Sequence, residues 1–390
     1  MKIAIVRQRY VAHGGAERVI TRFVEHLIKQ GHRVTLFAHQ WDQGDQWDRA
    51  VPGVAVHRVP MLSFGSFFRL VSFAFFSKRA ICREPFDLIF SLERTWHQDI
   101  YRAGDGCHRE WLARRNLSAF GKLRVAINPF HWAMCRIERQ IFTSPRTRII
   151  IANAQHVKDD IIRHYGTPTA RIEVVYNGVD LVRFHPENRP RYRRVVRSRF
   201  GIPDEAFLVL FVGSGFERKG LSVLIQAMGI VKIALPEAAP RLLIVGGGKR
   251  ERYIEAAETA GVAGEVCWAG TVKDVEQLYA AADLFVLPTR YDPFANVCLE
   301  AMATGIPVVT TRANGASELL TGPLAPFVLE DANDAPACAD LIQRACRSDH
   351  ALLGDAARKI AEGFSAAHCF EKWVALCEQA CERMETQEKT

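Results

Sequence analysis

The sequence lacks the features that mark membrane-spanning, disulfide-bonded and zinc-binding proteins. No apolar stretch reaches the roughly 18 to 20 residues that cross a bilayer. The ten cysteines include no Cys-x-x-Cys pair and none at zinc-ligand spacing from histidines, so we expect reduced thiols that serve as small apolar side chains. The segment Met1–Val6 has the pattern of a buried strand rather than of a secretory signal, and we therefore expect a cytoplasmic protein.

Glycine and proline, 27 and 17 of 390 residues, are too few for a collagenous or low-complexity chain. The chain instead has a globular composition, 48% apolar and 24% charged, and enough length for two or three domains. Its charge is unevenly placed. Residues 1–180 hold 27 Lys and Arg against 16 Asp and Glu, a net +11, whereas residues 181–390 have a net charge of −3. The first half is therefore predicted to face a polyanion or an anionic surface.

Short β-rich runs alternate with helical patterns along almost the whole chain. Because these runs are nearly continuous Val, Ile, Leu and Phe, they predict parallel strands covered by helices on both faces. We therefore predict an α/β fold with two parallel sheets. The runs are Lys2–Val6, Arg33–Phe37, Asp87–Phe90, Arg148–Ala152, Arg171–Val175, Phe207–Val212, Arg241–Val245, Glu265–Trp268, Asp283–Leu287 and Pro307–Thr310.

A turn-forming cluster at residues 176–180 predicts the join between the two domains. We expect a basic first domain over residues 1–178 and a second domain over 179–365. Residues 366–390 predict one long helix, with Phe370, Trp373, Val374 and Cys377 on one side. This helix is longer than the second sheet needs, so we expect it to pack on the first domain.

Two glycine-rich loops follow predicted strands, at the ends where open α/β sheets bind ligands. Gly14 and Gly15 precede a helix, an arrangement that suits a phosphate and equally suits a plain turn. Gly213 opens a loop that carries Arg218 and Lys219, two cations that could neutralise a diphosphate or form a solvated surface pair. The second loop lacks both the third glycine of a dinucleotide fingerprint and the Gly-Lys of a P-loop.

Two acidic residues, Asp292 and Glu300, lie after the run Asp283–Leu287, on a predicted loop and the helix that follows it. We expect both carboxylates to address one cleft. Carboxylates are acceptors for sugar or ribose hydroxyls, and N–H groups at a helix start suit phosphate oxygens. The backbone N–H groups expected to point to the same place are those of Phe294, Ala295, Asn296 and Val297.

This spacing of Asp292 and Glu300, within Tyr-Asp-Pro-Phe…Leu-Glu-Ala-Met-Ala…Gly-Ile-Pro-Val-Val, resembles the family 4 glycosyltransferases. These are retaining enzymes of the GT-B fold, with two Rossmann-like domains that face a deep interdomain cleft. The likeness runs from Gly14 and Gly15 to the last helix. Residues 102–106 and the basic region after them resemble the group that adds glucose to heptose in the lipopolysaccharide inner core, the (heptosyl) alpha-1,3-glucosyltransferase I group.

The resemblance implies a role for each residue of a nucleotide-sugar donor site. Glu300 would accept hydrogen bonds from the ribose, Asp292 would contact the donor sugar, and the two cations would hold the diphosphate. The family more often has Glu at position 292 and Gly-Ile at 295–296. These differences leave the identity of the donor sugar undetermined. The implied donor site comprises Gly14, Gly15, Gly213, Arg218, Lys219, Val272, Asp292, Phe294, Ala295, Asn296, Val297 and Glu300.

Asp105 lies in a Gly-Asp-Gly turn that we expect at the inner edge of the first domain. It either orients or deprotonates the acceptor hydroxyl, with His108 as the alternate, or it is a plain turn residue. Arg109 is a further candidate for acceptor contact. The resemblance implies catalysis without a bound metal or other cofactor. The candidate catalytic residues are Asp105, Asp292, Lys219 and Arg218.

Residues 107–139 hold seven basic and two acidic residues, interleaved with aromatic ones. This composition fits docking on anionic lipid head groups and, taken alone, equally fits nucleic acid. Because the implied acceptor is a glycolipid, we expect peripheral association with the inner face of the cytoplasmic membrane and no nucleic acid. The phenylalanine-rich segment 61–81 is either a core helix with a loop or a second membrane contact.

The sequence therefore predicts a retaining hexosyltransferase. It would move a hexose, with glucose favoured, from a UDP-sugar to a heptose of the lipopolysaccharide inner core. The alternatives are a nucleotide-sugar epimerase of the same architecture, a glycosyltransferase with another lipid-linked or polysaccharide acceptor, and a noncatalytic binder of anionic lipid or nucleic acid. An epimerase would need little basic surface, so the charge asymmetry disfavours it.

Overall fold

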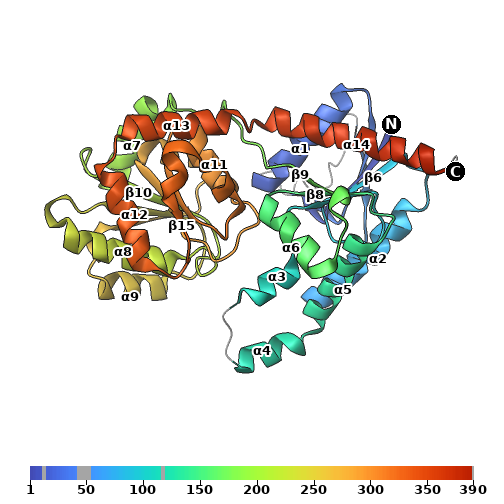
Figure 1. Ribbon diagram of the computed structural model, residues 1–390, viewed down its shortest axis with the longest axis horizontal. Coiled ribbons are helices and arrows are strands. Elements are labelled where there is room, and N and C mark those ends of the chain that lie inside the picture. Colours follow the sequence, from blue (N-terminus) through green and yellow to red (C-terminus); the bar gives the residue numbers. More distant parts are fainter. Residues whose placement is uncertain (11–14, 42–53, 116–118, 389–390) are drawn as a thin grey trace. The chain divides into compact units, whose positions relative to one another are not determined.

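The computed structural model describes residues 1–10, 15–41, 54–115 and 119–388 (Figure 1). The chain forms two compact units, one of Met1–Tyr176 with His368–Thr390 and the other of Asn177–Ala367. Each unit is built on one parallel sheet, which confirms the predicted α/β fold with two sheets. Among the described residues, none of the helices combines the length and apolar character of a membrane span.

The first unit contains a seven-stranded parallel sheet in the order β5-β3-β1-β6-β7-β8-β9. Its third strand in this order, β1, pairs with β3 through Ile3 and Val34 and with β6 through Ile3 and Leu88. The strands are β1 (Lys2–Val6), β3 (Arg33–Ala38), β5 (Ala55–Arg58), β6 (Leu88–Ser91), β7 (Ile100–Ala103), β8 (Ile149–Ala152) and β9 (Ile172–Val174), with a separate pair formed by β2 (Arg9–Tyr10) and β4 (Gln40–Trp41).

Helices surround this sheet, and several have recognisable boundary signals. Asn128 caps α5 by accepting the N–H of Phe130, with Pro129 at the first helical position, and Gly166 ends α6 at φ 65°. The helices are α1 (Gly15–Lys29), α2 (Ser66–Ile81), α3 (His108–Ala113), α4 (Ala119–Ala126), α5 (Pro129–Thr143), α6 (Gln155–Tyr165), the 3-10 turn η2 (Thr169–Arg171) and α14 (Ala366–Glu388).

The last helix, α14, packs within the first unit. Trp373 is fully buried, with its ring 5.0 Å from that of Phe23 and 5.8 Å from that of Phe90. Phe370, Val374 and Cys377 are buried on the same side, as the sequence pattern predicts. The aromatic face of α14 is therefore part of the core of the first unit.

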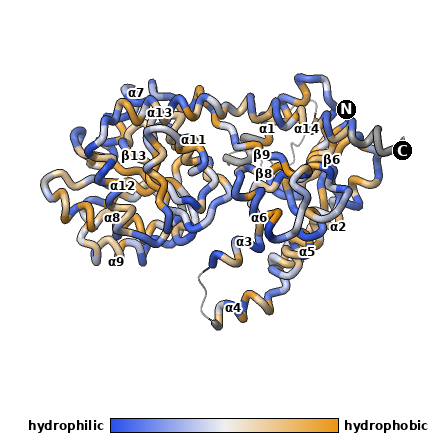
Figure 2. The backbone as a smooth tube through the Cα atoms, in the orientation of Figure 1, coloured by the Kyte–Doolittle hydropathy of each residue, from blue (hydrophilic) through white to orange (hydrophobic). Residues whose placement is uncertain are grey.

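The second unit contains a six-stranded parallel sheet in the order β12-β11-β10-β13-β14-β15. Figure 2 shows hydrophobic chain at β13 in this unit and at β6 in the first, as expected for strands covered on both faces. The strands are β10 (Leu208–Val212), β11 (Arg241–Val245), β12 (Val266–Gly270), β13 (Leu284–Leu287), β14 (Val308–Thr311) and β15 (Val328–Leu329).

The helices of the second unit lie on both faces of its sheet. An ion cluster ties α7 to the start of β13, because Asp283 accepts from Arg189, Arg193 and the fully buried Arg197. The helices are α7 (Asn188–Arg199), α8 (Leu221–Ala234), η3 (Pro236–Ala238), α9 (Glu251–Thr259), η4 (Ala263–Glu265), α10 (Val275–Ala281), α11 (Asn296–Ala303), η5 (Gly315–Leu319), η6 (Gly322–Phe327), α12 (Ala335–Arg347) and α13 (His350–Glu362).

The phenylalanine-rich segment 61–81 forms a loop followed by helix α2, so the core-helix interpretation is confirmed in part. Phe73 is buried in an apolar cluster with Val59 and Ile89. Phe64, Phe68 and other large apolar side chains of the segment are exposed, so a second membrane contact stays a prediction. All ten cysteines are free thiols.

Candidate functional site

The sheet order of the second unit brings two predicted loops together. Strand β10 lies between β11 and β13, so the direction of the strand order changes at β10. Because β10 and β13 are parallel neighbours, the loops that follow them leave the same edge side by side. One loop carries Arg218 and Lys219 and the other carries Asp292. Such a switch point is where open α/β sheets bind ligands.

Arg218, Lys219 and Asp292 form one ion cluster. Nη1 of Arg218 lies 2.8 Å and Nζ of Lys219 lies 2.5 Å from Oδ2 of Asp292. Lys219 and Asp292 are buried, whereas the Arg218 side chain is 42% exposed. Burial alone would raise the pKa of the Asp292 carboxyl, but Lys219 and Arg218 outweigh this effect and lower it below its ordinary value. The cluster therefore contains two cations and one ionised carboxylate.

Two glycines permit the close packing around this cluster. Gly220, just before α8, has φ 78°, and a Cβ there would overlap the carbonyl oxygen of Pro288. A Cβ at Gly213 would lie 3.4 Å from Cγ of Lys219. The backbone also joins the two loops, since the N–H of Arg290 donates to the carbonyl of Arg218 at 2.9 Å. Glycine at position 220 lets the loop after β10 lie directly against the end of β13, and glycine at position 213 leaves room for the Lys219 side chain.

The start of α11 follows Asp292 in the same loop. The N–H of Ala295 donates to Oδ1 of Asn314 at 3.0 Å, so this amide is already occupied within the fold. Asn296 and Val297 are the first two residues of α11, whose N–H groups have no acceptor within a helix. The Asn296 side chain accepts from Nδ2 of Asn177 at 2.6 Å. Of the four predicted amides, those of Asn296 and Val297 are thus placed at a helix start.

Glu300 lies one turn further along α11. Its Oε2 is 3.0 Å from the hydroxyl of Tyr279, which is also 3.2 Å from the carbonyl oxygen of Val297. Burial raises the pKa of Glu300 to about 7, although the Tyr279 hydrogen bond and Arg183 act in the opposite direction. Glu300 therefore changes its charge near neutral pH.

Sequence reasoning missed Tyr279 and Asn314 as parts of this site. Tyr279 lies in the short apolar helix α10 and is fully buried, so its sequence context indicates only a core residue. Asn314 follows β14 and is also fully buried. An Asn after a strand in a parallel sheet is the one signal that could have indicated its role, because strand ends meet at one edge.

The remaining residues of the predicted nucleotide-sugar site lie outside the ion cluster. Val272 follows β12 on the same edge of the sheet, separated from β10 by β11. Phe294 is buried in the loop before α11. Gly15 begins α1 in the first unit, and Gly14 lies outside the described residues.

In the first unit, Asp105 is an exposed turn residue at the end of β7. Its side chain is 71% exposed, and Oδ2 lies 3.5 Å from Nη1 of Arg94. Arg94 also donates to the carbonyl of Gly106 at 3.1 Å and to the buried Glu138 at 2.9 Å. The Gly106 residue has φ 66°. Arg94 thereby fixes the turn that presents the Asp105 carboxylate to solvent.

His108 begins α3 and belongs to an aromatic cluster. Its Nε2 lies 3.0 Å from Nδ1 of His131, and its ring stacks on Trp111 with centroids 5.3 Å apart. Burial, Arg94 and His131 lower the pKa of His108 to about 3, so it is a weak proton acceptor at neutral pH. Arg109 donates to the carbonyl of His164 at 3.4 Å.

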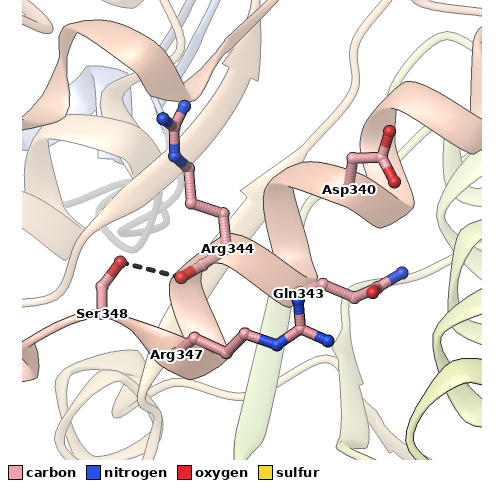
Figure 3. Close-up of a pocket in the computed structure, with 5 residues that line it drawn as sticks. All are labelled: Asp340, Gln343, Arg344, Arg347 and Ser348. Atoms are coloured by element: carbon pink, nitrogen blue, oxygen red, sulfur yellow. Dashed lines mark hydrogen bonds between the residues drawn. The ribbon is translucent and has the colours of Figure 1, made fainter.

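Two further features of the described part of the chain concern ligand binding. It contains no group of three or more His, Cys, Asp or Glu residues placed to hold a metal ion. A surface pocket of about 460 Å³ lies at the C-terminal end of α12, lined by the five residues in Figure 3, none of them predicted site residues. Its Arg344 and Arg347 suit the negative end of the helix dipole, and we assign it no ligand.

Comparison with known proteins agrees with this class of fold. The solved structure of WaaG, a glycosyltransferase involved in lipopolysaccharide biosynthesis, matches with a TM-score of 0.81 at 24% identity, over 96% of this chain and 99% of that one. The structure of Anabaena Alr3699/HepE in complex with UDP-glucose matches with a TM-score of 0.69 at 20% identity, over 99% and 100%. The chain thus has the two-sheet GT-B fold of glycosyltransferases.

Family models and sequence relatives narrow this class. A "Glycosyltransferase Family 4" model matches residues 13–183, and a "Glycosyl transferases group 1" model matches residues 206–348. The chain is 27% identical to lipopolysaccharide glucosyltransferase WaaG of Escherichia coli over 81% of each chain. It is 33% identical to D-inositol 3-phosphate glycosyltransferase of Salinispora arenicola over 55% of this chain and 51% of that one. The chain belongs to glycosyltransferase family 4. These matches give the epimerase alternative no support.

Proposed function

We propose that this glycosyltransferase moves glucose from UDP-glucose to a heptose of the lipopolysaccharide inner core. The donor would bind at the carboxyl edge of the second unit's sheet. The acceptor would be recognised by the first unit, where Asp105 is exposed. The proposal agrees with the WaaG relative, whose name specifies a lipopolysaccharide glucosyltransferase.

The observation that carries the proposal is the ion cluster of Arg218, Lys219 and Asp292. Two cations share one carboxylate oxygen, so the cluster retains one positive charge at neutral pH. A guanidinium offers five N–H donors and an ammonium three, which leaves donors for phosphate oxygens after the contacts with Asp292. Such preset cations stabilise the charge that develops on a departing diphosphate.

The rest of the donor would be recognised around α11. The Glu300 carboxylate would accept hydrogen bonds from ribose hydroxyls, and the N–H groups of Asn296 and Val297 would face phosphate oxygens. Asp292 would contact the sugar. The related Anabaena structure was solved with UDP-glucose, which supports this class of donor.

The proposed reaction retains the anomeric configuration. The bond between the anomeric carbon and the diphosphate oxygen breaks, and the acceptor oxygen forms its bond on the same face. Asp105 would accept the acceptor's proton, because its carboxylate is exposed and held beside Arg94. We propose that no metal ion takes part, with Arg218 and Lys219 supplying the positive charge. Activity should then persist in excess EDTA.

We also propose that the enzyme works at an anionic membrane surface, without nucleic acid as a partner. Large apolar side chains are exposed on and beside α4, which lies away from the strands of its unit in Figure 1. They alternate with Lys122 and Arg124. Apolar side chains between basic ones suit insertion among anionic head groups. The exposed residues are Phe120, Leu123, Ile127 and Trp132.

Transfer of labelled sugar tests the function. The enzyme is incubated with radiolabelled UDP-glucose and lipopolysaccharide truncated to the inner-core heptoses, with Lys219→Ala as the inactive control. We expect label in the lipopolysaccharide with wild-type enzyme only. UDP-galactose, GDP-mannose and a lipid-linked acceptor without heptose test the alternative donors and acceptors. Absence of both transfer and donor hydrolysis with every donor would contradict the proposal.

A further inference from the structure

We propose that Tyr279 is a positioning residue for the donor. Its hydroxyl would hold the Glu300 carboxylate and the first turn of α11 in the arrangement that receives the ribose. The inference rests on the proposed function, because it assigns Glu300 the role of ribose acceptor. It adds a residue on a different helix, α10, that would not itself touch the donor.

The Tyr279 hydroxyl contacts two groups of α11, the Glu300 carboxylate and a backbone carbonyl of the first turn. The Tyr279 oxygen lies 3.0 Å from Oε2 of Glu300 and 3.2 Å from the carbonyl oxygen of Val297. These two groups are one turn apart on α11. The hydroxyl has one hydrogen, which it donates to the Glu300 carboxylate when that group is ionised, and this contact fixes the rotamer of Glu300.

The Tyr279 ring has little freedom to move. It is fully buried, with its centroid 5.7 Å from that of Phe184 and 5.9 Å from that of Phe285. Burial and Glu300 raise the pKa of Tyr279 well above its ordinary value, so the hydroxyl keeps its proton. A rigid, protonated hydroxyl beside a carboxylate acts as a hydrogen-bond donor.

Two charged groups near Glu300 act on its pKa in opposite directions, Arg183 lowering it and Glu276 raising it. Arg183, before α7, and Glu276, on α10, face Glu300, and they form their own ion pair at 2.7 Å. Cys298, on α11, faces Tyr279, and burial keeps this thiol protonated by raising its pKa. The Tyr279 hydroxyl is thus a direct stabilising contact of ionised Glu300. With Oε2 held in this way, Oε1 can accept from the vicinal hydroxyls of a ribose.

The test compares UDP binding by wild type, Tyr279→Phe and Glu300→Gln between pH 5.5 and 9, by isothermal titration calorimetry. For wild type we expect affinity to rise with pH through about 7, as Glu300 ionises. Tyr279→Phe should weaken binding roughly tenfold at pH 7 and move this rise upward by about one pH unit, because the ionised carboxylate loses a donor. Glu300→Gln should remove the rise near pH 7 and leave only the one that comes from the second ionisation of the UDP terminal phosphate, at a pKa of about 6.

Tyr253→Phe is the matched control, since Tyr253 is equally buried in the same unit, on α9. It should leave the pH profile unchanged. A Tyr279→Phe variant with a lower melting temperature but wild-type affinity and pH profile would overturn the inference, even if Glu300→Gln weakens binding. A Glu300→Gln variant that binds like wild type would instead overturn the donor site itself. No UDP binding by wild type would contradict both.

Discussion

Lys219 is the residue whose position says most about the chemistry. It is buried beside Asp292. Removing an ammonium group from water costs free energy, so a buried lysine at a ligand-binding sheet edge indicates that its positive charge has a function. We predict that Lys219→Ala weakens UDP binding by roughly 10- to 100-fold, the loss expected for one charge-assisted contact. Calorimetry measures this loss.

Lys232→Ala is the control for that prediction. Lys232 lies on α8 of the same unit and pairs with Glu265 at 2.9 Å, outside the ion cluster. It should bind UDP like wild type. Equal affinities for the Lys219 and Lys232 variants would show that the cluster does not hold the diphosphate.

Glu300 gives a second prediction, which concerns stability without any ligand. Its pKa is raised from 4.5 to about 7 in the folded state, so its favourable contribution is complete below about pH 4.5 and is lost as the pH rises through 7. Glu300→Gln does not titrate. Relative to wild type, this variant should gain about 2 kcal/mol of unfolding free energy between pH 5 and pH 8.

Urea denaturation at both pH values measures this gain. Glu255→Gln, which changes an exposed carboxylate on helix α9 of the same unit, is the control. If the Glu300 variant differs from wild type by the same amount at pH 5 and pH 8, the carboxyl is not titrating near 7.

The sequence predicts which residues gather at the site better than it predicts their contacts. Arg218, Lys219 and Asp292 follow strands, and parallel strands end at one edge, so their meeting follows from topology. Topology alone does not predict that both cations pair with Asp292, because this pairing depends on the packing of Gly220 against Pro288. Tyr279 could not be predicted, since a buried tyrosine in an apolar helix has the pattern of core.

At the scale of elements, all ten predicted strands form. The continuous apolar runs, such as those of β1 and β11, are found at the predicted residues. The missed strands have weaker patterns. Strand β5 is a half-buried edge strand with His57 and Arg58, β7 is interrupted by Arg102, and β2, β4 and β15 have only two residues each. Their pairing is decided by neighbouring strands rather than by their own sequence.

Helix α14 makes a testable contribution to the first unit. Trp373 packs on Phe23 and Phe90, and the guanidinium of Arg102 lies 5.0 Å from its ring. We predict that Trp373→Ala lowers the unfolding free energy by about 3–5 kcal/mol, because it opens a large cavity in the core. Trp132→Ala, whose side chain is 64% exposed, should change it by less than about 0.5 kcal/mol.

Chemical denaturation followed by circular dichroism distinguishes the two tryptophan variants. Similar unfolding midpoints for both would mean that α14 does not complete the core of its unit. The comparison is matched, because both changes remove the same side chain from a helix.

Helix α4 and its surroundings give the element-scale prediction for membranes. Replacing Phe120, Leu123 and Ile127 together by serine should reduce binding to vesicles of phosphatidylglycerol at least tenfold, because three exposed apolar side chains lose their partner in lipid. Vesicle co-sedimentation measures this. Ile233→Ser, which changes an equally exposed residue on α8, should bind like wild type. Unchanged binding of the triple variant would exclude α4 as the contact.

For the whole molecule, the net charge of each half and the charges at the proposed site indicate different ligands: a broad anionic surface for the first half and a diphosphate for the second. Residues 1–180 carry a net +11, which suits a broad anionic surface. Residues 181–390 have a net charge of −3 and yet contain the proposed diphosphate site. The negative net charge of this half does not prevent a diphosphate from binding. The buried Lys219 and the adjacent Arg218 would contact it at hydrogen-bond distance. Charges further away are screened by salt and therefore contribute less.

The central claim is that the edge of the second sheet at β10 and β13 holds a nucleotide diphosphate sugar. A crystal structure of the wild-type enzyme with UDP-glucose tests it most directly. We predict diphosphate oxygens within about 3 Å of Arg218 and Lys219, and ribose hydroxyls on Glu300. A UDP-glucose molecule bound elsewhere, with Lys219 and Glu300 contacting none of its atoms, would contradict the account.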